Sequence, residues 1–177
     1  MGFFGKDKIT KDELIDNVAD MVFNSTSAES LKPYSDMLKN MKETPEINER
    51  QQREILVLEM LAITRTVSKL GDKISNPKEF LDKFHEKIYS RISDDEKKQV
   101  EFEEMVQNRY QTYYQILASK EENMMFFFGK QFTDYFLDKD VKHQGLVMFV
   151  SVAQIFALHI ENFEKMIREI FSKFDVV

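Results

Sequence analysis

The sequence predicts an all-α fold: a single-domain bundle of six or seven helices with long central helices. Five Gly and three Pro in 177 residues leave little material for turns and irregular loops. Apolar residues recur at steps of three and four, the period of one helix face, and no segment alternates as a half-buried strand does. We therefore expect residues 10–177 to form one domain after a flexible segment, 1–9, with a minor hinge at 71–76.

The first two helices are placed by a capping pattern and by a proline. Thr10 and Glu13 form a capping box, which predicts a helix running to about Phe23. Apolar residues from 31 to 41 mark a short second helix. Because proline is tolerated in the first turn of a helix, we expect Pro33 to lie there.

The clearest helical pattern lies between Glu46 and Leu70, where apolar residues occupy more than one side of the predicted helix. Such a helix is typically surrounded by others, so we expect it at the centre of the bundle. Gly71 follows it and predicts a left-handed C-terminal cap. The residues of its main apolar stripe are Leu56, Met60, Ile63, Val67 and Leu70.

Three further helix starts can be read from cap residues. Asn76, followed by Pro77 and Glu79, predicts the start of a fourth helix. Capping boxes led by Ser93 and Ser119 predict the starts of a fifth and a sixth helix.

The last helix, about 140–174, changes character at Glu161. Residues 145–160 are nearly all apolar, but 16 residues with polar interruptions are fewer than the roughly 20 that a membrane span needs. We expect this half to be a buried central helix rather than a membrane span. Beyond Glu161, charged residues at i,i+4 spacing predict a solvated amphipathic helix.

The composition argues against several classes of function. The net charge is −6 and the basic residues are interspersed, which argues against nucleic-acid binding. The absence of cysteine excludes disulfides, thiolate metal sites and cysteine nucleophiles. No signal-peptide pattern begins the chain, so we expect a cytoplasmic protein. Without a phosphate loop or a nucleophile elbow, the sequence favours a non-enzyme with no cofactor.

Two carboxylate–histidine pairs are the candidates for a metal centre. Asp82 with His85, and Asp140 with His143, are each spaced i,i+3, which places the two side chains together on a helix. A bundle di-metal centre needs further inward-facing glutamates, and no third pair of this kind is present. Surface or hydrogen-bonded histidines explain these residues more simply.

An excess of aromatic and methionine side chains is the main functional indication. Successive helical residues point about 100° apart, so Phe126, Phe127 and Phe128 cannot all face one core. At least one should meet a second subunit, a partner helix or an apolar ligand, with ordinary core packing as the alternative for the rest. The candidate interface or apolar-ligand residues are Met124, Met125, Phe126, Phe127, Phe128, Tyr110, Tyr113 and Tyr114.

These observations favour a non-catalytic, intracellular helical interaction or regulatory module that forms homo-oligomers, or binds a protein partner, through its aromatic-rich surface. One alternative is a bundle that binds an apolar ligand or a lipid chain between the last three helices. A carboxylate/histidine metal-dependent enzyme is the third choice.

Overall fold

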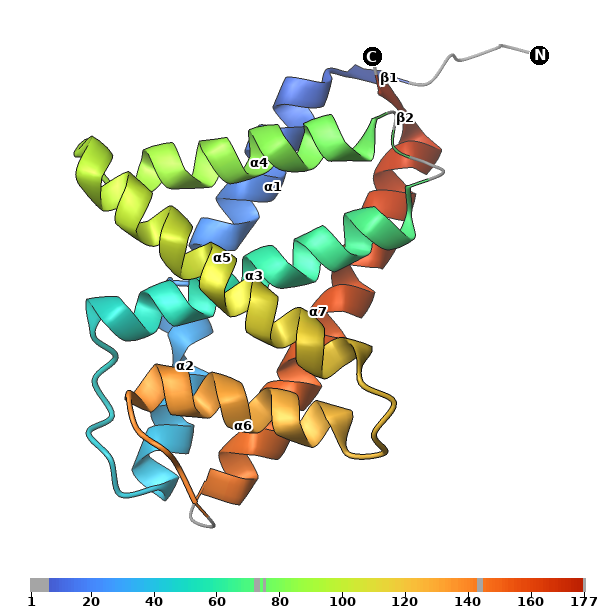
Figure 1. Cartoon of the computed structure of the whole chain (residues 1–177). Helices are drawn as coiled ribbons and strands as arrows, with labels where there is room; N and C mark the ends of the chain where they lie inside the picture. The colour runs from blue at the N-terminus through green and yellow to red at the C-terminus, as the bar shows by residue number, and fades with distance from the viewer. Residues whose placement is uncertain (1–6, 72–73, 75, 143–144, 177) are drawn as a thin grey trace.

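The computed structural model describes residues 7–71, 74, 76–142 and 145–176 (Figure 1). These residues form an all-α bundle, which confirms the predicted fold class. Its seven helices are α1 Lys11–Asn24, α2 Ala28–Asn40, α3 Glu49–Lys69, α4 Pro77–Ile92, α5 Glu96–Ala118, α6 Met124–Leu137 and α7 Leu146–Lys173. Two strands, β1 Asp7–Ile9 and β2 Phe174–Val176, pair in parallel and bring the two ends of the described chain together.

Helix α3 lies at the centre of the bundle, as its sequence predicts. Fourteen of its 21 residues are buried, and it contacts α1, α4, α5, α6 and α7. Leu56, Met60 and Ile63 all belong to the core. In Figure 1 the other helices surround α3 on several sides, which explains why its apolar residues are not confined to one stripe.

Helix α7 runs the length of the molecule, from the end occupied by α2 and α6 to the end where β1 and β2 pair (Figure 1). It packs most extensively against α6 and then against α3. The backbones of α6 and α7 approach closely because residue 129 is glycine. A Cβ atom there would lie 1.9 Å from the carbonyl oxygen of Phe149. Beside this crossing, Phe128 stacks on Phe156 with ring centroids 4.4 Å apart.

Two expectations about helix interiors and ends were wrong. Pro33 is the sixth residue of α2, because the helix begins earlier, at a cap in which the Ser27 side chain accepts from the amide of Ser30. The missing proline N–H affects only the carbonyl of Glu29, an exposed residue where water can replace the donor. Gly71 is not a left-handed cap, since no described glycine has a positive φ.

Two predicted caps are also displaced. Ser93 ends α4, and the cap of α5 is Asp95, whose carboxylate accepts a 3.0 Å hydrogen bond from the amide of Lys97. Ser119 ends α5, and α6 begins at Met124 without a side-chain cap. At α5 a second local cap residue, Asp95, replaces Ser93, whereas α6 starts without a side-chain cap.

The predicted flexible segment and the predicted hinge stay predictions. Residues 1–6 of the expected flexible segment, and residues 72, 73 and 75 of the expected hinge, lie outside the described residues. Residues 7–9 form β1, which the sequence did not predict. A three-residue strand is too short to show a recognisable alternation of polar and apolar side chains.

Candidate interaction surface on α7

The first half of α7 exposes a continuous apolar face to solvent. Leu146, Val147, Val150 and Leu158 are 45%, 64%, 46% and 52% exposed. The opposite side of the same turns, which includes Met148, Val152 and Phe156, is buried against the bundle. We call the exposed side the α7 face; it consists of Leu146, Val147, Val150, Gln154, Ala157 and Leu158.

The expectation that residues 145–160 form a buried central helix was therefore wrong. Helices α6 and α3 pack against one side of α7 and leave the other side uncovered. By length and composition α7 could cross a membrane, with a mean hydropathy of 1.6, but only 28% of its most apolar stretch is buried. A single helix of this length and composition is weak evidence for a membrane span, and its low burial also distinguishes it from the mostly buried core helix of a soluble protein.

The two ends of the α7 face differ in charge. Helix α7 begins at Gly145 without a side-chain cap and has no acidic residue in its first turn. Its first amide groups therefore keep the partial positive charge of a helix N-terminus. At the other end, the exposed side becomes charged from Glu161 onward. The face is apolar apart from Gln154, positive at its start and bordered by a carboxylate at its end.

The predicted aromatic site is divided between the core and the surface. Tyr113 and Phe128 are fully buried, with ring centroids 4.9 Å apart. Phe126 is half-buried and packs edge-on against Phe149, whereas Phe127 is 43% exposed, as the 100° spacing of helical residues requires. The remaining candidates are Met124 and Met125, both half-buried, Tyr114, which is 37% exposed, and Tyr110, whose hydroxyl is hydrogen-bonded inside the bundle.

Phe127 lies on a different part of the surface from the α7 face. It lines a hollow of about 500 Å³ together with Ile116, Ser119 and Gln131. These residues come from α5, α6 and the connection between them, not from α7. The structure thus separates the predicted aromatic surface from the larger apolar surface, which sequence reasoning did not find.

The comparisons add no family. Comparison of the chain with protein-family models, curated proteins and solved structures finds no match. The functional assignment therefore depends on the chemistry of the described side chains.

The candidate metal ligands that the structure describes are not assembled into a site. Asp82 pairs with Lys78 at 2.7 Å on α4, and Asp140 lies in the connection before α7, not on a helix, where it pairs with Lys130 at 2.9 Å. His143 lies outside the described residues. Among the residues that the structure describes, no group of three or more His, Asp or Glu side chains could hold a metal ion.

His85 is held in a hydrogen-bonded chain between α3, α4 and α5. Its Nδ1 donates to the carbonyl oxygen of Leu81 at 2.7 Å, and its Nε2 lies 3.1 Å from the hydroxyl of Tyr110. The same hydroxyl lies 3.2 Å from Oγ1 of Thr64. Burial lowers the pKa of His85, because the charged imidazolium is poorly solvated there. These contacts indicate a neutral histidine that supplies hydrogen-bond partners to buried polar groups.

Helix α3 also carries two buried carboxylates, each facing a basic side chain. Glu54 forms a bidentate ion pair with Arg109, with Nη2–Oε1 and Nε–Oε2 distances of 2.7 and 3.0 Å. Glu59 Oε1 lies 2.6 Å from His159 Nδ1, although the alignment does not meet hydrogen-bond geometry. Burial, with the charge of Glu59, raises the pKa of the nearby Tyr34.

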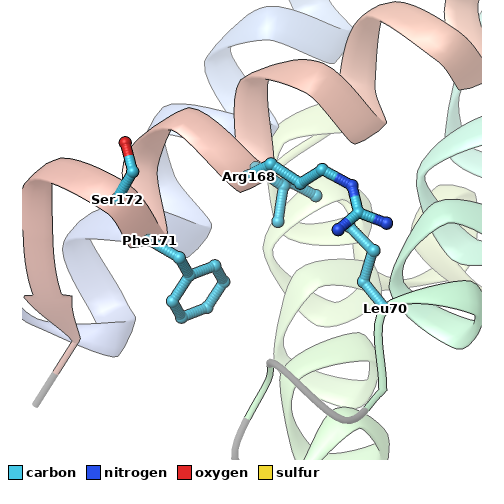
Figure 2. Close-up of a pocket in the computed structure, with 5 residues that line it drawn as sticks. Leu70, Arg168, Phe171 and Ser172 are labelled. Carbon is cyan, nitrogen blue, oxygen red and sulfur yellow. The ribbon is translucent and has the colours of Figure 1, made fainter.

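A second hollow lies where the end of α3 meets the end of α7 (Figure 2). It has a volume of about 380 Å³ and is lined by Leu70, Ile167, Arg168, Phe171 and Ser172. In Figure 2, Phe171 and Arg168 project from α7 on the side of Leu70, and Ser172 points away from them. The hollow is mostly apolar, with one guanidinium group that is already paired with Glu164 at 2.9 Å.

Proposed function

We propose that this protein is a non-catalytic helical interaction module whose contact surface is the α7 face. The observation that carries the proposal is the row of four large apolar side chains, each about half exposed, along one side of a firmly packed helix. Contiguous apolar surface of this kind is uncommon on soluble monomers and marks interaction sites. Covering half-exposed Val and Leu side chains contributes about 1 kcal/mol each, so the face offers about 4 kcal/mol to a partner.

The packing of α7 supports the same proposal. The close crossing at Gly129 and the stacked pair of Phe128 with Phe156 fix the inner side of α7. The outer side chains therefore project from a rigid element, and a partner need not order the helix on binding. His85 and Tyr113, whose pKa values are shifted mainly by burial, lie inside the bundle in packing positions.

The experiment uses two matched substitutions. Val150 on the α7 face and Val100 on α5 are 46% and 48% exposed, so Val150→Glu and Val100→Glu place the same charge at equal exposure on different surfaces. Tagged protein, produced at native level in its own host, is isolated and its assemblies are weighed by native mass spectrometry. Circular dichroism confirms that both variants are folded.

We expect the wild-type protein and V100E to carry a stoichiometric protein partner, which is either another copy or a different chain, and V150E to lose it. The reason is that a buried, unpaired carboxylate opposes association. Retention of the partner by V150E, or a monomer in all three samples, would overturn the proposal.

The second candidate function is binding of an apolar anion in the hollow at the end of α7. It is favoured by the apolar wall of Leu70, Ile167 and Phe171 beside the guanidinium of Arg168. A volume of about 380 Å³ is near the lower end of the range for small-ligand pockets. The same spectra test it, because a small molecule retained by both wild type and V150E would favour this function.

A further inference from the structure

We propose that the occupant of the α7 face is a second copy of this chain, with the two α7 helices packed antiparallel about a two-fold axis at the level of Val152. This inference rests on the proposed function and names its partner. Three features of α7 support it: the pairing of the face with itself, the charges at its two ends and the position of its one polar residue.

The α7 face is complementary to itself in this register. An antiparallel alignment centred midway between Val150 and Gln154 places those two residues opposite each other. It also places Leu146 opposite Leu158, and Val147 opposite Ala157, in the other copy. Every residue of the face thereby meets another residue of the same face. In a two-fold interface both copies contribute this surface, so eight large apolar side chains are covered at once.

The charges at the ends of the face favour the antiparallel direction. In this register the exposed Glu161 of one helix passes the N-terminus of the other, which lacks a side-chain cap and has no acidic residue in its first turn. A carboxylate near a helix N-terminus is favourable because it meets free amide groups and the positive end of the helix dipole. The exposed Lys142 precedes that N-terminus and adds an attractive charge. The symmetry repeats this contact at the other end.

A parallel arrangement lacks these contacts. It would place two uncapped N-termini together and set Glu161 beside Glu161, so like charges would meet at both ends. The antiparallel arrangement also accounts for Gln154, the one polar residue of the face. The two copies of Gln154 lie about 6 Å apart along the direction of the helices. Because a side-chain amide both donates and accepts hydrogen bonds, each copy can pair with the other.

A lipid surface fits the α7 face less well than a second copy. Helices that lie on membranes usually carry Lys and Arg beside their apolar side. Here Glu161 borders the face at one end and the single Lys142 at the other, and the chain has a net charge of −6. The net negative charge opposes both an anionic membrane and a second copy, but a second copy also offers the N-terminal amides that Glu161 can meet.

The direction of the pair can be measured because the chain contains no cysteine. A nitroxide attached to Lys165→Cys, at an exposed position of α7, is the only label in each chain. Residue 165 is 13 residues beyond the axis, so the antiparallel pair separates the two labels by about 40 Å along the helices. A parallel pair would bring them within about 20 Å, since packed helices lie 8–10 Å apart. The readout is the dipolar distance distribution of the purified, full-length protein.

Sedimentation velocity of unlabelled protein supplies the second readout. We expect a dimer for wild type and V100E, association weakened by about 100-fold in V150E, and weakening by about tenfold in Glu161→Lys. Flotation with phosphatidylcholine and phosphatidylserine vesicles tests the membrane alternative.

Three results would overturn the inference: a short label distance, a monomer in the absence of lipid, or a monomer that floats with vesicles. If the pure protein is a monomer but V150E loses a different protein partner in the host, the proposed function stands and only the second copy is excluded. If V150E loses nothing in the host, both proposals fail.

Discussion

Gly129→Ala tests the closest packing in the bundle, where two opposing effects can be compared. In an exposed helix interior this substitution stabilises by about 1 kcal/mol, because alanine has the higher helix propensity. Here the new Cβ would lie 1.9 Å from the Phe149 carbonyl oxygen and 2.7 Å from its carbon. Both atoms belong to the backbone of α7, so the two helices must separate. Overpacking of this kind costs about 1–3 kcal/mol, and the separation also loosens the ring pair of Phe128 and Phe156.

After the propensity gain of about 1 kcal/mol is subtracted and the loosened ring pair is added, we expect a net loss of about 1–2 kcal/mol in the free energy of unfolding, measured from urea midpoints, and a fall of about 2–8 °C in Tm. Gly71→Ala is the matched control. Its Cβ would lie 3.5 Å from Pro77 Cγ, an ordinary contact, and the backbone there does not have a positive φ. The control should be neutral or slightly stabilising. An unchanged or raised midpoint for Gly129→Ala would refute the close crossing of α6 and α7.

Three further substitutions test the interior. Arg109→Ala leaves the Glu54 carboxylate buried without its ion pair and should lower the free energy of unfolding in urea by about 3–5 kcal/mol. Recovery of stability when Glu54→Gln is added would support this cause, and a loss near zero would contradict it. Burial lowers the pKa of His85, so the folded state resists protonation: its contribution to stability is present above about pH 6.5 and is lost as the pH falls. His85→Gln should flatten the acid side of the stability profile, and parallel profiles for both proteins would exclude this role. Met60→Ala should cost about 2–5 kcal/mol, and a loss below about 1 kcal/mol would be inconsistent with a central α3.

Caps could be predicted where they depend on residues close in sequence. The Thr10 hydroxyl accepts from the amide of Glu13 at 3.1 Å, and the Glu13 carboxylate accepts from the amide of Thr10 at 2.8 Å. Both bonds lie within four residues, so the sequence contains all their information. Between α4 and α5, Ser93 and Asp95 both offer a cap, and the packing of the two helices decides between them. Sequence reasoning could not see that packing.

The α7 face shows a second limit of sequence reasoning. Periodicity reports which residues are apolar, but not how many neighbours a helix has in the folded chain. Helix α3 and the first half of α7 are both apolar on more than one side, yet α3 is surrounded and α7 is covered by helices on one side. The 100° spacing of helical residues predicts that one of Phe126, Phe127 and Phe128 is exposed on α6, and Phe127 is exposed. The larger exposed apolar surface nevertheless lies on the neighbouring helix, α7.

The second half of α7 shows what folding alone requires of this helix. Beyond Glu161 the inner side continues to pack, with Ile167 buried, while the outer side carries solvated charges such as Lys165 and Glu169. The same bundle could be held with polar residues on the outer side from Leu146 to Leu158, because those side chains contribute little to the core. Their apolar character is therefore not explained by the stability of one chain. Under the proposed function another protein covers this surface, and the change at Glu161 marks where the surface ends.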